Sequence, residues 1–464
     1  MKARFFLFYV FLTNINPCFC QKNDGITVET SQKYFIGAIK YLVQSQSDTT
    51  IQGKQYQGEW EVFMELTEPF FFLGLKQKKR DSNCFTISAI HNFLAEMYIA
   101  DTTLQLLKPT ISKAFKEIQS FRNNQRFNFW KALPPQRDLK LGKEPQPIQL
   151  VRRPTNFILK SRFVGKTTNV ADDADDTSLG NLASLYHNKI FEDTLSLISS
   201  KSYDEYIDLN RKNRNWFNIL FHGLPNSGAF LTWHWTEHQF KYWNKLRSAL
   251  NGAFVFVPIS PSYPKAYKPW IPFGANEVDV VVNANVLTYL AMTDQLDKSA
   301  GKKGAIFVIN ELLKRERWEN TAIYYPNSFH IHYAVARAYA AGLTELKISC
   351  ETILAHLLHS QKSDGSFASS LWLNHGDLIQ STAYALHALL DLQSKGMKVP
   401  KTCIEKAIAY LLSNAKFEDN KVSWSGGVYF SGGTFVRGIM VWKSDAYTTA
   451  MIAKCLQKWM FLTK

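Results

Sequence analysis

The sequence predicts an all-α protein built from helical hairpins, and three observations lead to this fold class. Ten segments carry apolar residues at spacings of three and four, the pattern of helices with a buried face. Strand-like alternation is scarce, and the clearest short candidate is 254–258 (FVFVP). Motifs with a glycine and an aromatic residue recur where helices are expected to end, which is typical of a repeated helix–turn–helix unit.

The ten predicted helices are spread over most of the chain. The chain has 464 residues and is 46% hydrophobic, which is enough for one large core or two of ordinary size. No apolar run reaches the roughly 18 residues of a membrane-spanning helix, so a polytopic membrane protein is excluded. The predicted helices cover 34–46, 88–107, 178–197, 286–296, 305–313, 331–341, 350–358, 382–392, 403–412 and 446–459.

The charge balance is strongly basic, with a formal net charge of +15. Such a balance is compatible with nucleic acid, anionic lipid or phosphorylated partners. The sequence contains no zinc-ligand spacing, no RNP-type motif and no basic zipper, and its basic residues are dispersed. We therefore expect no nucleic-acid partner.

The N-terminus has the pattern of a secretory signal. Lys2 and Arg4 precede the apolar run 5–12, and Cys18 and Cys20 come before a polar stretch. The pattern predicts a signal peptide at 1–20 with cleavage after Cys20, and a lipid-modified cysteine is the weaker alternative. A buried N-terminal strand is the structural alternative. The protein is thus expected to be exported (periplasmic, secreted or lipid-anchored), with 21–464 as a single domain.

Four cysteines remain after the predicted signal peptide: Cys84, Cys350, Cys403 and Cys455. An exported protein can form disulfides, and four cysteines allow three pairings, which sequence alone does not distinguish. Buried free thiols are equally consistent with a core of this size.

Three segments repeat one pattern. The segments 38–46 (AIKYLVQSQ), 353–361 (ILAHLLHSQ) and 407–414 (AIAYLLSN) end a predicted helix with Gln or Asn. Each is followed by a turn with glycine and an aromatic residue, as in 58–60 (GEW), 364–367 (DGSF) and 422–427 (VSWSGG). We expect glycine to permit the tight turn, the aromatic ring to pack over it, and the amide to bond free carbonyls.

This pattern resembles the QW repeats of terpene cyclases and related prenyltransferase subunits. The resemblance covers residues 30–60 and 170–460 and implies an α/α toroid, with an inner ring of helices inside an outer ring. The segment at about 126–165 is basic and rich in proline, and it is expected to cross between parts of this single toroid domain.

An acidic box is the strongest local signal. Asp173-Ala174-Asp175-Asp176-Thr177 matches the DxDDT box of class II terpene cyclases, which include the squalene–hopene cyclases. The resemblance implies that Asp175 is the general acid that protonates an alkene or epoxide, flanked by Asp173 and Asp176. Crowded carboxylates in a dry site cannot all ionise, so such a cluster retains a proton.

The resemblance also implies a histidine that supports the acid. We lean to His234 over the other candidates, which are His222, His238, His330, His332 and His375. For each of them, an ordinary core or surface histidine is the alternative interpretation.

A protonation mechanism further needs surfaces that stabilise a cation. Aromatic faces attract a cation by about 0.5–2 kcal/mol per contact. Aromatic residues at predicted turns and helix ends are therefore the candidate substrate contacts, although ordinary core packing is an alternative for each. They are Trp233, Trp235, Trp372, Trp424, Tyr429, Phe430 and Trp442.

Other interpretations of the box remain open. The overlapping stretch Asp172-Asp173-Ala174-Asp175-Asp176 also fits the DDxxD pattern of enzymes that bind Mg²⁺ and ionise a diphosphate. Alternatively, its four aspartates cap a helix and favour its dipole. The main hypothesis needs no cofactor or metal, and Mg²⁺ only if the substrate is a diphosphate. The expected partner is a small isoprenoid or lipid-like molecule; peripheral membrane contact and oligomeric state stay open.

The alternative function is that of an exported toroid that binds without catalysis or acts on a glycan. A hydrogen-bonded core network is the default expectation for Asn283 and Asn285, with a site role for Asp279 or Asn285 as the alternative.

Overall fold

The computed structural model of the chain describes residues 27–67, 78–134, 150–156, 169–210, 227–234, 278–315, 318–320, 322, 324–432 and 440–463. The predicted signal peptide at 1–20 and the predicted strand at 254–258 lie outside these residues.

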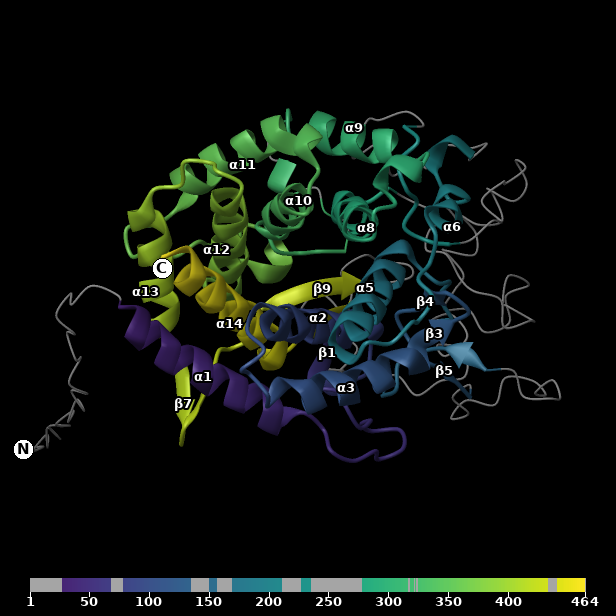
Figure 1. Cartoon of the computed structure of the whole chain (residues 1–464), viewed down its shortest axis with the longest axis horizontal. Coiled ribbons are helices and arrows are strands. Elements are labelled where there is room, and N and C mark those ends of the chain that lie inside the picture. The colour runs from purple at the N-terminus through teal and green to yellow at the C-terminus, as the bar shows by residue number, and fades with distance from the viewer. Residues whose placement is uncertain are drawn as a thin grey trace, which may run out of the picture.

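An inner ring of helices forms the centre of the described structure (Figure 1). Each helix packs against the next in chain order, and the last one closes the ring against the first. These helices are buried on nearly all sides, as expected of a helix with no polar stripe. They are α2 (Cys84–Ala100), α5 (Ala174–Phe191), α8 (Val280–Met292), α10 (His330–Ala340), α12 (Ile379–Ser394) and α14 (Asp445–Leu462).

A second layer of helices surrounds this ring (Figure 1). α1 packs on α14, α3 on α2, α9 on α8, α11 on α10 and α13 on α12. These helices bury only one face, as α3 does with Leu107, Ile111 and Ile118. The outer helices are α1 (Val28–Ser45), α3 (Leu107–Ile118), α9 (Lys302–Leu312), α11 (Lys347–Ser360) and α13 (Lys401–Ser413). The predicted α/α toroid is therefore confirmed.

All ten predicted helices are present, with ends that shift by a few residues, whereas α3 was not predicted. The remaining helical elements in the described residues are short. They are α6 (Ser200–Asp204), η2 (Gln119–Phe121), η3 (Asp208–Asn210), η6 (Leu296–Lys298), η7 (Trp318–Asn320), η8 (Thr344–Leu346) and η9 (Trp372–Asn374).

A small antiparallel sheet is an addition that the sequence did not predict. Its strand order is β2-β1-β10-β9, and Figure 1 shows β9 crossing the middle of the ring. Trp442 lies opposite Met64 on one side and Phe430 on the other. The strands are β1 (Val62–Leu66), β2 (Lys79–Asp81), β9 (Val428–Gly432) and β10 (Met440–Lys443).

Three further strand pairs are very short. β4 and β5, with their partners, fall in or near the expected crossing segment, whose residues 135–149 and 157–165 lie outside the described part. The pairs are β3 (Arg122–Asn123) with β4 (Arg126–Phe127), β5 (Ala132–Leu133) with β6 (Val151–Arg152), and β7 (Lys416–Glu418) with β8 (Lys421–Ser423).

The turn after α1 is tied by side chains to its neighbours. Gln46 Nε2 donates to the carbonyls of Gly58 (2.9 Å) and Thr110 (3.0 Å), and Trp60 Nε1 donates to the carbonyl of Leu42 (2.7 Å). Gly58 has a φ of +95°, and a Cβ there would lie 2.4 Å from a backbone oxygen of α3. Only glycine therefore fits this close approach.

The two later repeats have related bonds. Gln361 Nε2 donates to the carbonyls of Gly365 (3.1 Å) and Cys403 (2.8 Å), which links the turn after α11 to α13. Trp424 Nε1 donates to the carbonyl of Leu411 (2.6 Å). The glutamines thus tie two of the turns to the first turn of a neighbouring helix. The two tryptophans donate to carbonyls in the last turn of α1 and of α13, where intrahelical partners run out.

The four cysteines of the described core are free and buried, so no disulfide joins them. Among the described residues, no helix combines the length and apolar character that a bilayer crossing requires.

Candidate functional site

The acidic box lies at the start of α5. Asp173 is the N-cap residue, and its side chain accepts a hydrogen bond from the backbone N–H of Asp176 (2.7 Å). The Asp173 carboxyl therefore caps the helix, as expected if the box has a structural role. Asp175 and Asp176 follow in the first turn, where the helix dipole favours negative charge.

A second segment runs beside the box and holds it in place. Ala174 N–H donates to the carbonyl of Thr232, and His234 N–H donates to the carbonyl of Asp172, both at 2.8 Å. Asn283 of α8 in turn bonds both backbone groups of Phe230, at 2.9 and 3.0 Å. The core network expected for Asn283 thus fixes the segment 230–234 between α5 and α8.

Asp175 receives two hydrogen bonds from distant parts of the chain. Asn285 Nδ2 donates to its Oδ1 (2.7 Å), and the Tyr325 hydroxyl donates to its Oδ2. The carboxyl is only 4% exposed. Burial raises the pKa of Asp175 to about 6, while the bonds from Tyr325 and Asn285 oppose that rise. Asp175 is thus a buried acid whose conjugate base already has donors.

The two flanking aspartates are also buried. Burial raises the pKa of Asp176 to about 7. Burial, reinforced by the neighbouring Asp176 carboxyl, raises the pKa of Asp173 well above its usual range. Asp176 Oδ1 has no hydrogen-bond donor among the described residues. A box in this state retains a proton near neutral pH, because ionising all of its carboxyls would bury several like charges together.

His234 lies beside the box through its backbone rather than its ring. The ring packs against Tyr203 and Tyr206, at centroid distances of 5.6 and 4.8 Å. Neither ring nitrogen has a partner in the described structure, and burial lowers the pKa of His234 to about 3. The ring of His330, another of the candidate histidines, packs against Tyr325 with a centroid distance of 4.4 Å, and the Tyr325 hydroxyl donates to Asp175.

An aromatic cluster adjoins Asp175 through Tyr325, and we define it by the rings around Phe430. Phe430 contacts Tyr325 (5.9 Å) and Trp442 (5.3 Å), and Trp442 contacts Phe129 (5.5 Å). Phe430 is partly exposed, whereas its neighbours are buried. The members are Phe85, Phe129, Tyr324, Tyr325, Tyr429, Phe430 and Trp442.

Four of the predicted substrate contacts, including Phe430 itself, lie in or beside the aromatic cluster. Tyr429 and Trp442 belong to the aromatic cluster, and Trp233 pairs with Asp173 in a β-bridge and donates from Nε1 to the Tyr324 hydroxyl (3.2 Å). Trp424 lies in the hairpin turn after α13 instead. Trp235 lies outside the described residues, and the side chain of Trp372 is not among those described.

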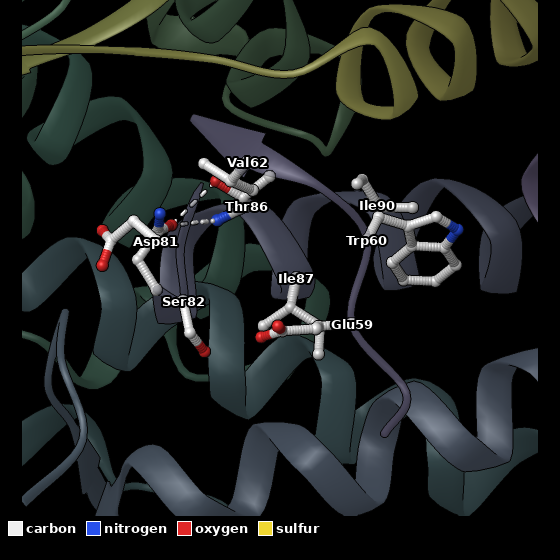
Figure 2. A pocket seen from close by; sticks show the side chains of 9 residues that line it. Glu59, Trp60, Val62, Asp81, Ser82, Thr86, Ile87 and Ile90 are labelled. Atoms are coloured by element: carbon white, nitrogen blue, oxygen red, sulfur yellow. Dashed lines mark hydrogen bonds between the residues drawn. The ribbon is translucent and has the colours of Figure 1, made fainter. Parts of the chain in front are cut away.

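A small cavity lies between the first turns of α2 and strand β1 (Figure 2). It has room for about one water molecule, roughly 10 Å³. Glu59, Asp81, Ser82 and Thr86 are among its lining residues. Burial raises the pKa of Glu59 to about 7. This cavity is too small for an organic substrate.

The described residues contain no group of three or more His, Cys, Asp or Glu side chains arranged to hold one metal ion. The carboxyls of the acidic box accept hydrogen bonds from a side-chain amide, a hydroxyl and a backbone N–H.

The fold of this chain is similar to that of several solved structures. The chain is similar to a variant of the type II terpene cyclase MstE from Scytonema in complex with merosterolic acid A, its product, with a TM-score of 0.52 and 14% identity. The match covers 94% of this chain and 98% of that chain. The chain has the fold of a type II terpene cyclase.

Two further solved structures are similar to this chain. Another variant of MstE, in complex with its substrate geranylgeranyl dihydroxybenzoate, gives a TM-score of 0.52 at 13% identity over 94% of this chain and 99% of that one. A protein from Actinoplanes gives a TM-score of 0.50 at 13% identity, covering 92% and 99%. No family model and no curated protein matches the chain.

The sequence analysis anticipated one of the two hydrogen-bond partners of Asp175 only as an alternative and missed the other. Asn285 had been considered for a site role because an amide stood inside an apolar helix, and the structure places it on Asp175. Tyr325 was not singled out. A Tyr-Tyr-Pro run before α10 was the available signal, but nothing local connected it to a box 150 residues away.

Proposed function

We propose that the protein is a class II terpene cyclase that starts the cyclisation of an isoprenoid by protonation from Asp175. The observation that carries this proposal is the buried Asp175 carboxyl, which accepts bonds from Asn285 and Tyr325 beside an aromatic cluster. The terpene cyclase fold supports it, as does the substrate of MstE, which carries a geranylgeranyl chain.

Asn285 and Tyr325 act on the acid strength of Asp175. When a proton leaves Asp175 for an alkene carbon, negative charge develops on the carboxyl oxygens. Two donors already aimed at these oxygens stabilise that charge without rearrangement. Burial works in the opposite direction and keeps the carboxyl protonated at rest. Together they give an acid that is protonated under mildly acidic conditions and still donates readily.

The aromatic cluster and the burial of Asp175 both support this function. The faces of Phe430 and its neighbouring rings attract a carbocation without reacting with it. The shielded position of Asp175, at 4% exposure, supports this function over a glycan-directed groove, in which a working carboxyl would face water. We further propose that the protein is exported through its N-terminal segment.

The direct test is turnover by purified protein. Farnesyl, geranylgeranyl and squalene-type substrates are incubated with the wild type and with Asp175→Asn, and products are separated by gas chromatography with mass detection. We expect cyclised product from the wild type and a loss of at least about 100-fold in the variant, since general acid catalysis contributes about 10²–10⁴-fold.

A matched control separates chemistry from folding. Asp364→Asn changes an aspartate of the hairpin turn after α11, where it bonds Ser366, and should retain full turnover. Cyclised product that Asp175→Asn leaves unchanged would discard this mechanism. Absence of product from the wild type with all three substrates would reject the proposed function for these substrate classes.

A further inference from the structure

Four large apolar side chains are exposed at one end of the toroid, where the inner helices α2 and α14 finish. Ile99 (42% exposed) lies in the last turn of α2 and Leu106 (59%) just before α3, while Phe461 (45%) and Leu462 (41%) are the last two residues of α14. The two helix ends adjoin, because a glutamine of α14 donates to a backbone carbonyl of α2 at 2.9 Å. Apolar residues that are exposed singly are ordinary, whereas a group at adjoining helix ends indicates a contact surface. We call these four residues the apolar rim.

The outer helix α1 begins at the same end. Two hydrogen bonds bring the last turn of α1 to the first turn of α14. Trp60 Nε1 donates to the carbonyl of Leu42, in the last turn of α1 (2.7 Å). The Ser444 hydroxyl, at the N-cap of α14, donates to the carbonyl of Glu61, which follows Trp60 (2.7 Å). Because α1 and α14 pack against each other, the beginning of α1 lies at the end of α14, next to the apolar rim (Figure 1).

The sequence that leads into α1 carries the features of membrane targeting. Lys2, Arg4 and the apolar run 5–12 form the predicted signal, and Cys20 is a candidate for lipid modification. Seven residues separate Cys20 from α1, and they span at most about 25 Å. A lipid on this cysteine, or retention of the apolar run in a bilayer, would therefore hold the apolar rim close to the membrane.

Lysines outnumber carboxylates around the apolar rim. The end of α12 belongs to the same region, because Lys458 of α14 bonds Asp391 near that end. The turns that meet here are the beginnings of α1, α3 and α13 and the ends of α2 and α12. Their exposed or half-buried charged side chains are the lysines Lys33, Lys108, Lys395, Lys398 and Lys401 and the carboxylates Glu29, Asp101 and Glu405. Exposed apolar side chains flanked by lysines are typical of a protein that binds anionic lipid at the membrane interface.

The acidic box lies at the opposite end of the toroid. α5 runs in the same direction as α2, because Asn92 of α2 bonds the carbonyl of Leu179 (3.1 Å). One turn further along both helices, Glu96 accepts a bond from the Tyr186 hydroxyl (2.7 Å). The box begins α5 and therefore belongs to the end at which the inner helices start, away from the apolar rim. A role for the rim is thus independent of the proposed function.

We propose that the apolar rim and the lysines around it dock this end of the toroid on a bilayer that contains anionic phospholipid. The four apolar side chains enter the boundary between headgroups and acyl chains, and the lysines contact the phosphate groups. In this orientation the acidic box faces away from the membrane. A second copy of the chain is the competing occupant of the same surface, and the experiment distinguishes the two.

The test is partition of the full chain onto phospholipid vesicles, measured by co-sedimentation over a range of lipid concentrations. Vesicles of phosphatidylcholine alone are compared with vesicles that also contain phosphatidylglycerol. Phe461→Ser combined with Leu462→Ser should lower the partition coefficient at least about tenfold, because two partly inserted apolar side chains are lost. Lys395→Gln combined with Lys398→Gln should lower it about 20-fold on the anionic vesicles, at about 1 kcal/mol for each lysine, and leave it unchanged on the neutral ones.

Matched controls come from the opposite end of the toroid. Ile51→Ser and Lys54→Gln change exposed side chains in the turn after α1, and they should leave both partition coefficients within about twofold. Residues 1–20 contribute equally in every variant, so the ratio of partition coefficients reports the rim and its lysines. Circular dichroism establishes which variants are folded, and each of the two double variants tests the surface without the other.

The outcomes separate the docking surface from the proposed function. Partition that the folded rim and lysine variants weaken, and the controls do not, supports the surface whether or not any substrate is cyclised. Failure of the wild type to bind either kind of vesicle, or binding that neither double variant changes, overturns it even if cyclised product forms. A wild-type dimer in analytical ultracentrifugation that Phe461→Ser with Leu462→Ser converts to a monomer, without vesicle binding, overturns it in favour of an interface between copies.

Discussion

Tyr325→Phe tests how the structure sets the strength of the acid. The substitution removes the hydroxyl that donates to Asp175 and keeps the ring, so the packing against Phe430 and His330 is preserved. A hydrogen bond to a charged group contributes about 1.5–3 kcal/mol. One pKa unit corresponds to about 1.4 kcal/mol, so the pKa of Asp175 should rise by about one to two units.

The sign of the expected effect follows from which form the hydroxyl stabilises. Tyr325 donates to the carboxylate and lowers its pKa, so removing the donor keeps Asp175 protonated to higher pH. The wild-type pKa of about 6 predicts that kcat falls as pH rises through about 6. In Tyr325→Phe this fall should move to about pH 7–8, with a lower maximal kcat because the acid is weaker.

The assay is kcat for cyclisation measured from pH 4 to 9. Tyr186→Phe is the matched control, because the Tyr186 hydroxyl also donates to a carboxyl, that of Glu96 (2.7 Å), near the other end of α5. The control should leave the pH profile in place. A profile of Tyr325→Phe that stays at the wild-type pH, or moves to lower pH, would refute this reasoning.

Three further predictions concern the box, the repeats and the thiols. In urea unfolding, the gain in unfolding free energy from Asp176→Asn should be about 2 kcal/mol larger at pH 8 than at pH 5. The reason is that the pKa of Asp176 is raised in the folded state, so the wild type loses stability as pH rises through that pKa. Gln361→Ala should lower the unfolding free energy by about 1–3 kcal/mol, since two carbonyls lose their donor; Gln393→Ala, half-buried at the end of α12, should have a much smaller effect. Dithiothreitol should leave the melting temperature unchanged, because Cys84, Cys350, Cys403 and Cys455 are free thiols; a drop of several degrees would contradict this.

The helices could be predicted because their signal is local. Apolar spacing marks a buried face within one segment, and the positions of the inner helices follow from it. The four-stranded sheet could not be predicted in this way. Its strands have three to five residues, and β1 pairs with β10 across more than 370 positions of sequence. Such short strands carry almost no periodic signal, and nothing local marks their partners.

The candidate site shows the same difference between local signals and partners that are distant in sequence. The four aspartates within 172–176 mark the acidic box in the sequence itself, and the structure places Asp173, Asp175 and Asp176 in one buried turn. The partners of Asp175 come from 110 and 150 positions away, so only the closed ring of helices brings them together. His234 illustrates the limit: it lies on the segment that pairs with the box, but its ring packs against Tyr203 and Tyr206.

The aromatic residues show a similar contrast. Composition and position indicated Trp233, Tyr429 and Trp442, which meet near the acid, but Trp424 was grouped with them. A tryptophan in a hairpin turn and one beside a reaction site look alike in sequence. The hydrogen bond of Trp424 to the carbonyl of Leu411 shows what it does in the fold.

The central claim is that a shielded carboxyl on α5 delivers a proton to an alkene. The most direct measurement is product formation by the wild type and Asp175→Asn in deuterium oxide, followed by mass spectrometry of the cyclised product. The account predicts one deuterium incorporated by the wild type at the carbon that is protonated, and no cyclised product from the variant. Cyclised product without deuterium, or equal product from both proteins, would contradict it.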